Sequence, residues 1–183
     1  NKKLIKAAED ALAAALKIVE KGIEIRKIGI EIEKAIKPYG FQAIHNLSGH
    51  SIKKYDLHAG ITIPNFDNLN DNVLEEGIYA IEPFSTSGFG AVKDWKPSTI
   101  YHLKKAGSVR DNFAREVLNY IAEEYSTLPF CSRWIYKKFG SRGLIAIKRI
   151  EESNLLHHYP QLIEKGNGKV AQAEHTIIIT NKE

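Results

Sequence analysis

The sequence predicts a mixed α/β (α+β) fold in which helices come first, short strands follow, and a second helical segment interrupts the strands. Three observations support this prediction. Residues 4–36 place apolar side chains at helical spacing, and from residue 41 short apolar runs alternate with glycine turns. Residues 109–164 then return to helical spacing before one last apolar run. Helices next to a strand-rich segment are typical of layered α/β architectures.

Two amphipathic helices are predicted at the start of the chain. The apolar stripe of the first consists of Leu4, Ile5, Ala8, Leu12, Ala15, Leu16 and Val19. Gly22 ends it, and the isoleucines in residues 23–32 then almost alternate, which is typical of a strand. The charged residues 31–34 favour a helix instead, so we predict a second helix that ends at the Lys-Pro-Tyr-Gly of residues 37–40.

Strands are predicted at residues 41–47, 58–63, 77–84, 98–104 and 170–180. The helical segment between the last two is longer than an ordinary connection and should form a small subdomain. We therefore predict one domain from residues 1–108 and 165–183, with residues 109–164 as a helical insertion. Asn1 leads directly into a helix, and the final strand has no following partner. Both ends are interpreted as cuts within a larger fold.

The composition indicates a cytoplasmic protein. Hydrophobic residues make up 43% of the chain and charged residues 26%, which suits a folded domain with a solvated surface. No run approaches the roughly 18 apolar residues of a membrane span, and no secretory leader is present. Cys131 is the single cysteine, so no intrachain disulfide can form and a reducing compartment is expected.

The net charge of +4 is concentrated in one segment. Residues 104–152 hold ten Lys and Arg against six Asp and Glu. A solvated helical surface is the simpler interpretation. The alternative is a face for an acidic partner such as ribosomal RNA, with no specific DNA binding. We identify no aromatic-interleaved binding motif in support of that alternative.

Two glutamates stand in otherwise apolar strands. Alternation places Ile78, Ala80 and Glu82 on one face of the strand at 77–84. In the last strand Glu174 shares a face with Gln172. A carboxylate in such a place is costly to bury unless it is paired, protonated or bound to a metal. Either glutamate alone could answer a buried cation, but the two together favour a functional site.

A histidine extends this set. His50 follows a glycine at a predicted strand end, and a second histidine, His58, lies eight residues further on. A lone histidine is more often structural, but one imidazole and two carboxylates suit Mn, Fe, Co or Zn. No local metalloprotease spacing such as HExxH is present, so the ligands would have to converge from separate strands.

Four short runs, taken together, resemble the signatures of methionine aminopeptidases. They are Asn-Leu-Ser-Gly-His at 46–50, Leu-His-Ala-Gly at 57–60 with Ile-Pro-Asn at 63–65, Ala-Ile-Glu-Pro-Phe at 80–84 and Ala-Gln-Ala-Glu-His-Thr at 171–176. The insertion, with Thr-Leu-Pro-Phe-Cys-Ser-Arg-Trp at 127–134 and His-Tyr-Pro at 158–160, resembles the subdomain of the archaeal and eukaryotic type II enzymes. The resemblance covers essentially the whole chain, as the C-terminal part of such an enzyme.

The resemblance implies a pita-bread fold with a winged-helix-like type II insertion and two divalent metal ions. The family binds these ions, variously Co, Mn, Fe or Zn, through two Asp, one His and two Glu. His50, Glu82 and Glu174 match the histidine and the glutamates. The two aspartates lie upstream of the matching region in the family, and Asp10 and Asp56 have the wrong context to replace them. A segment before Asn1 or a partner chain would therefore have to supply them, and these residues alone should be inert.

The resemblance also implies the reaction, which is hydrolysis of the bond after the N-terminal methionine of a nascent protein. Glu82 would accept the proton of the attacking water, and His58 would contact the scissile peptide. Tyr159 would line the substrate pocket, and Leu57 would border the methionine side chain.

Two alternatives are considered. Prolidase and aminopeptidase P share the fold and metals, but the insertion and the run at 57–60 argue against them. The other alternative is a catalytically silent pita-bread relative that binds partner proteins or ribosomes.

Overall fold

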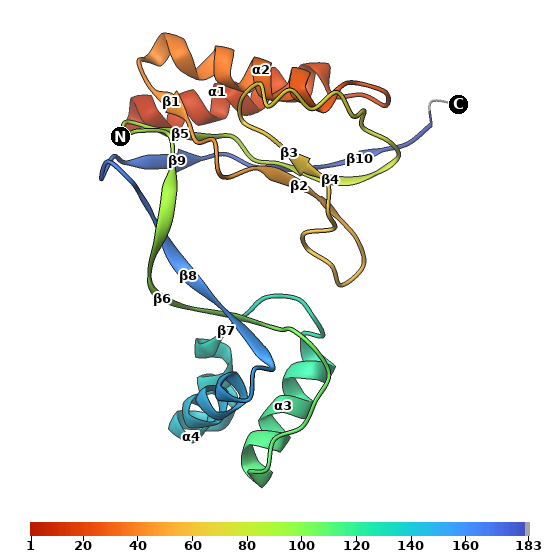
Figure 1. The fold of residues 1–183 in the computed structure, drawn as a ribbon, viewed down its shortest axis with the longest axis vertical. Coiled ribbons are helices and arrows are strands. Elements are labelled where there is room, and N and C mark those ends of the chain that lie inside the picture. The colour runs from red at the N-terminus through yellow and green to blue at the C-terminus, as the bar shows by residue number, and fades with distance from the viewer. Residues whose placement is uncertain (182–183) are drawn as a thin grey trace. The chain divides into compact units, whose positions relative to one another are not determined.

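The computed structural model describes residues 1–181, which form two compact units. The first unit consists of Asn1–Lys93 together with the chain from Leu162 onward, and the second is Asp94–Gln161 (Figure 1). The predicted insertion was bounded at residues 109 and 164, whereas the second compact unit begins at Asp94 and so includes most of one long strand.

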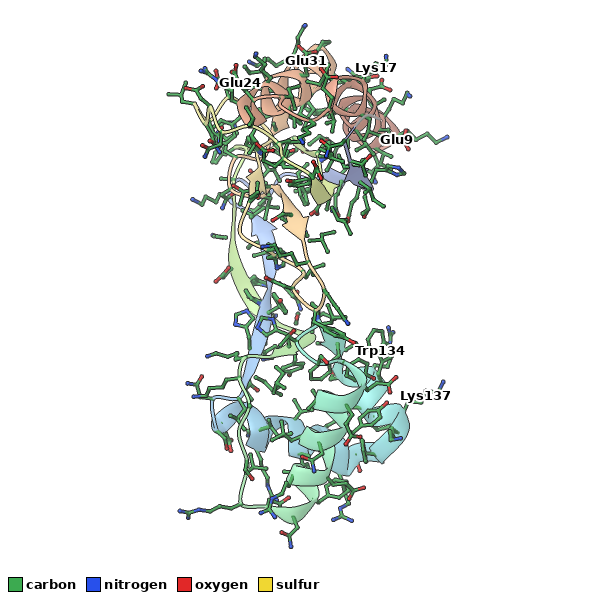
Figure 2. All side chains as sticks on the ribbon, turned by 90° about the vertical axis from the view of Figure 1, so that its right-hand side faces the viewer. Glu9, Lys17, Glu24, Glu31, Trp134 and Lys137 are labelled. Carbon is green, nitrogen blue, oxygen red and sulfur yellow. The ribbon has the colours of Figure 1, made fainter. Side chains whose placement is uncertain are left out.

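The first unit opens with the two predicted helices, and the structure confirms both. Helix α1 spans Lys2–Ile18, α2 spans Ile25–Ile36, and a 3₁₀ turn, η1, follows at Lys37–Tyr39. The near-alternating isoleucines therefore belong to a helix. Ile25, Ile28 and Ile32 are buried because their spacing of three and four brings them onto one face. The outer faces of the helices carry charged side chains such as those of Glu9, Lys17 and Glu31 (Figure 2).

The strands of the first unit form two sheets. They are β1 (Gln42–Ala43), β2 (Gly49–Ile52), β3 (Thr62–Ile63), β4 (Gly77–Ile81), β5 (Phe84–Thr86), β9 (Val170–Gln172) and β10 (His175–Ile179). The larger sheet has the order β10-β4-β2-β3, and the smaller sheet has the order β1-β5-β9. Helix α2 packs on β1 and β3, and α1 packs on β4, β5 and β9, so the helices cover one side of the strands (Figure 1).

The core of the first unit lies between these helices and the sheets. Its buried members are Ala11, Ala15, Ile25, Ile28, Ile32, Ile36, Ala43, Ile63, Leu74, Tyr79, Ile81 and Ile179. Each large side chain of this kind stabilises the fold by about 1.5–3 kcal/mol when fully buried. Isoleucine dominates the set, and its stiff branched side chain packs well on both the helices and the pleated sheet.

A buried carboxylate fixes the turn that leads into β9. The Glu164 side chain, with 3% exposure, accepts hydrogen bonds from the backbone N–H groups of Phe89, Gly90, Gly166 and Gly168. Burial alone would raise the pKa of Glu164, but the N–H donors outweigh it and the net pKa is lowered. The ionised carboxylate therefore ties the turn after Glu164 to the loop after β5.

The second unit combines helices with a three-stranded sheet. Its elements are β6 (Val92–Leu103), α3 (Asn112–Glu124), β7 (Phe130–Cys131), α4 (Ser132–Glu152) and β8 (Leu156–Glu164), and the strand order is β7-β6-β8. Its core consists mainly of Val117, Leu118, Ile121, Phe130, Ile135, Ile147 and Ile150.

The helical prediction for residues 109–164 was wrong at its end, where β8 is a strand. Asn154 adopts a left-handed φ of 57° just after α4 and turns the chain, and Pro160 could not continue a helix. Other strands differ in length. The predicted strand at 41–47 is shortened to β1, the predicted strand at 58–63 is shortened to β3, and β2 was not predicted as a strand.

The two runs that contain the glutamates are each divided. The predicted strand at 77–84 is split into β4 and β5, and that at 170–180 into β9 and β10. In both cases the break occurs where the chain leaves one sheet and enters the other. Glu82 and Glu174 therefore lie at the junction of the two sheets and not within a strand.

Candidate metal centre

His50 lies on β2, in the middle of the larger sheet. It stands opposite Ala80 of β4 and opposite Thr62 of β3. The preceding Gly49 lets the β4 backbone approach closely, because a Cβ built at Gly49 would lie 2.2 Å from the carbonyl oxygen of Ala80. The glycine next to His50 is therefore required by the packing of β2 on β4.

Glu82 reaches His50 from the link between β4 and β5. Its Oε1 lies 3.1 Å from His50 Nε2, and each of the two side chains is only 12% exposed. The pKa of the Glu82 carboxyl is raised, first by burial and then by the negative charge of Glu174. His50 and Gln172 oppose this shift but do not cancel it.

Two strand pairs, β5 with β9 and β4 with β10, bring Glu174 close to Glu82. In the smaller sheet Phe84 of β5 stands opposite Gln172 of β9, and in the larger sheet Ile81 of β4 stands opposite His175 of β10. These registers place the segment between β4 and β5, which carries Glu82, beside the segment between β9 and β10, which carries Glu174. The Ala173 N–H donates a hydrogen bond to the Pro83 carbonyl between these two segments, at 3.2 Å. Both glutamates are thus held by backbone pairing.

Gln172 is a site residue that the sequence reasoning did not include. Its Nε2 donates to Glu82 Oε2 at 2.7 Å and to Glu174 Oε2 at 3.2 Å, so one amide bridges both carboxylates. The signal was present, because Gln172 and Glu174 are two residues apart and were predicted to share a face. Its contact with Glu82 depends on the register of β5 on β9, which the sequence does not reveal.

His58 stands beside His50, as the ring centroids are 4.4 Å apart at an angle of 63°. It lies in the loop between β2 and β3, where Leu57 is partly exposed beside it. The pKa of the His58 imidazole is lowered, chiefly because the surrounding atoms remove part of its hydration and secondly because of His50. The neutral ring is therefore favoured, and it can donate one N–H.

Tyr159 belongs to the second unit, on β8. Its hydroxyl lies 2.7 Å from His102 Nδ1, and its ring packs edge-on against His157 at 4.7 Å. These contacts fix the phenol within its own unit.

Within the described residues, Asp10 and Asp56 are not arranged with His50, Glu82 and Glu174 so as to hold a metal ion. Asp10 lies on α1 and binds Lys6 at 2.7 Å as well as the Tyr39 hydroxyl. Asp56 lies in an exposed turn closed by backbone hydrogen bonds with Lys53. The expectation that neither replaces a missing aspartate ligand stays a prediction.

The donor set fits part of a divalent metal site. His50, Glu82 and Glu174 offer one imidazole and two carboxylates, a mixture suited to Mn, Fe, Co or Zn. A cation would also offset the negative charge of Glu174, which adds to burial in raising the pKa of Glu82. Within residues 1–181, however, no three His, Cys, Asp or Glu side chains are arranged to hold one ion as they stand. The glutamates are bridged by an amide instead.

Comparison with known proteins defines the family. Residues 1–181 match the sequence profile of metallopeptidase family M24. The chain therefore belongs to metallopeptidase family M24, and its fold is the pita-bread fold of that family.

Among curated relatives, a methionine aminopeptidase of Pyrococcus horikoshii is 44% identical over 179 residues, which is 96% of this chain and 61% of the relative. One from Methanocaldococcus jannaschii is 41% identical over 180 residues, covering 98% of this chain and 60% of the relative. The chain thus spans about 60% of the length of these relatives.

Solved structures with low sequence identity share the fold. A thermophilic Arx1 aligns with a TM-score of 0.79 at 17% identity, over 97% of this chain and 54% of that one. A methionine aminopeptidase from Thermotoga maritima aligns with a TM-score of 0.55 at 20% identity, over 98% of this chain and 48% of that one. No helix in the described part of the chain is long and apolar enough to span a membrane.

Proposed function

We propose that this chain is the larger part of a type II methionine aminopeptidase and removes the N-terminal methionine of nascent proteins by metal-assisted hydrolysis. The observation that carries the proposal is the meeting of His50, Glu82 and Glu174 at the junction of the two sheets. The curated relatives, named methionine aminopeptidase at 41–44% identity, support the same activity.

His50, Glu82 and Glu174 would act as metal ligands. Two divalent ions, Co, Mn, Fe or Zn, would lower the pKa of a water molecule and polarise the scissile carbonyl. Two aspartates, from a segment outside these 183 residues or from a partner chain, would complete the ligand set. The residues described here would then show little activity by themselves.

Glu82 would act as the general base and then the general acid. Its carboxylate would take a proton from the attacking water and return it to the leaving amine. The contacts of Glu82 with His50 and Gln172 orient it from both sides.

His58 would bind the substrate carbonyl. The lowered pKa of His58 keeps the ring neutral near pH 7, so that an N–H can donate to the oxyanion as the carbonyl becomes tetrahedral. Leu57 would border the methionine side chain, whose unbranched thioether suits an apolar wall. Tyr159 stays a proposed substrate-binding residue, and within its own unit its phenol is held by the hydrogen bond to His102.

The type II assignment rests on the insertion predicted at residues 109–164, and it is supported by the compact unit that residues 94–161 form. Nascent polypeptides that begin with Met would be the substrates, in the cytoplasm, with the ribosome as an associated partner.

The test is release of methionine from the peptide Met-Ala-Ser by the full-length protein, with its metal content measured in parallel. Glu82→Gln should reduce kcat by about 100-fold or more, the usual contribution of general acid–base catalysis. Glu75→Gln is the matched control, because Glu75 is an exposed carboxylate just before β4, the strand that Glu82 follows. Turnover near wild type in Glu82→Gln, with metals retained, would refute the general-base role. Wild-type protein with no metal and no released methionine would favour a catalytically silent binding module.

A further inference from the structure

The helix α4 carries a charge of one sign over most of its length. Residues 132–150 contain six Lys and Arg and no Asp or Glu, and all six basic side chains are exposed. The backbone of Gly140 is non-helical, with φ 63°, so the first two turns of the helix form a separate segment. This first segment, residues 132–139, contains three of the six cations and two exposed aromatic side chains.

Helical spacing turns the sequence of this segment into an ordered surface. At about 100° per residue, the side chains follow one another around the helix in an order that differs from their order in the chain. That order is Tyr136, Arg133, Lys137, Trp134 and Lys138. We call this surface the α4 face. The opposite side carries Ile135, which is fully buried, and Phe139. The exposed arc therefore presents two aromatic rings among three cations.

Trp134 stands at the end of an aromatic stack that begins in the core. Tyr101 stacks on Phe130 at 5.9 Å, Phe130 on Tyr125 at 5.2 Å, and Tyr125 on Trp134 at 5.7 Å. The indole remains 47% exposed, so about half of its surface is open to solvent. Figure 2 shows Trp134 and Lys137 projecting from the same side of the second unit. The ring is thus held rigidly and ready to stack on a further planar group.

Two cations of the α4 face are not neutralised by the protein. Of the basic residues of α4, Arg149 alone forms an ion pair within the described chain, with Asp111. Lys138 lies over the Tyr120 ring, 4.4 Å from its centroid, and so has an intramolecular contact. Arg133 and Lys137 have no carboxylate partner among the described residues. On this arc both lie on the same side of Trp134, with Lys137 next to the indole and Arg133 beyond it, and both are available to an anion.

We propose that the α4 face binds single-stranded nucleic acid, with a base stacked on Trp134 and phosphates bound by Arg133 and Lys137. Cations that follow the phosphate backbone and aromatic rings that stack on bases are the two elements of such binding. An acidic peptide would use the cations but leave the exposed indole without a planar partner. Single-stranded RNA and DNA share the phosphate and base chemistry, and a base paired within a duplex could not reach the ring.

The sequence did not reveal this motif, because residues that are neighbours on the helix surface are not neighbours in the chain. The run Arg133-Trp134-Ile135-Tyr136-Lys137 is interrupted by Ile135, which faces the core. Only helical geometry separates the buried residue from the exposed ones. The proposal does not depend on peptidase activity, because binding is measured without metal or peptide.

The experiment measures binding of fluorescein-labelled oligo(U) RNA and oligo(dT) DNA to the chain by anisotropy, over about 50–200 mM salt. Arg133→Gln/Lys137→Gln should weaken binding on the order of 10-fold and reduce the salt slope by about 1.4, since each single-strand phosphate contact contributes about 0.7. Lys2→Gln/Lys17→Gln is the matched control, because it removes the same charge from exposed positions of the first unit. It should change affinity less than two-fold.

The stacking step has its own readout. The chain has two tryptophans, so in a Trp95→Phe background the fluorescence comes from Trp134 alone and should be quenched by the oligonucleotide. Trp134→Ala should weaken binding at least five-fold, and Trp134→Phe should restore most of it. Binding of either oligonucleotide with these effects supports the proposal, and the ratio of affinities assigns the sugar. The proposal would be overturned if neither oligonucleotide binds, if the control pair loses as much affinity, or if Trp134 emission does not change. Equal binding of polyglutamate or of anionic phosphatidylserine vesicles would also overturn it.

Discussion

Gly49→Ala tests whether the close approach of β2 and β4 builds the metal centre. The added Cβ would lie 2.2 Å from the Ala80 carbonyl oxygen and 3.2 Å from the Glu82 backbone nitrogen. Ordinary contacts of this kind begin near 3.4 Å, so the two strands would have to separate by about 1 Å. Gly49 does not have a positive φ, so the effect comes from this contact and not from backbone conformation.

The expected destabilisation follows from two opposing effects. Overpacking of this kind costs about 1–3 kcal/mol. The alanine regains about 0.4–1 kcal/mol by restricting the unfolded chain. The net loss in the free energy of unfolding should be about 1–2 kcal/mol. The same separation would lengthen the 3.1 Å contact between His50 and Glu82, so affinity for Mn²⁺ should fall as well.

The assay is urea unfolding followed by far-UV circular dichroism, with hydrogen exchange of the β2 and β4 amides. Gly77→Ala is the matched control in the same sheet, because the nearest atoms to its Cβ would be those of the Tyr79 side chain, at 3.2 Å, and not backbone atoms. Its stability should stay within about 1 kcal/mol of wild type. A Gly49→Ala variant as stable and as slowly exchanging as wild type would refute the reasoning.

Three further changes have defined outcomes. Gly29→Ala should lower the urea midpoint of unfolding, because the added Cβ would lie 2.2 Å from the Phe66 carbonyl oxygen. Alanine by itself favours helices, so a raised midpoint would contradict this reasoning. The Asp111 carboxylate accepts the Ala114 N–H and pairs with Arg149, and both effects lower its pKa. The stabilisation that these two contacts give the folded state is therefore complete above about pH 4, and it is lost as the pH falls through the lowered pKa of Asp111 in the folded protein. Asp111→Asn should therefore lower the free energy of unfolding near pH 7 and should match wild type in acid. Gln172→Leu should weaken Mn²⁺ binding about 10–100-fold in calorimetry, and an unchanged affinity would exclude a positioning role.

Local chemistry was sufficient to predict much of the first unit. The isoleucines of α2 and the charged residues among them predicted a helix despite their near alternation, and the structure agrees. The β8 strand was missed because it directly follows a helix in the chain, although Pro160 cannot continue a helix. The β2 strand was missed because four residues between turns carry little periodicity.

The sequence by itself determined which features are unusual: two glutamates in apolar runs, a glycine before a histidine, and a basic segment. Only the tertiary structure decided which of them meet. Glu82 and Glu174 are 92 residues apart, and they adjoin because β4 and β10 pair in one sheet while β5 and β9 pair in the other. That register depends on the sum of many backbone hydrogen bonds and core contacts, which no local pattern specifies. The same is true of Gln172, whose amide reaches both carboxylates only across the junction of the two sheets.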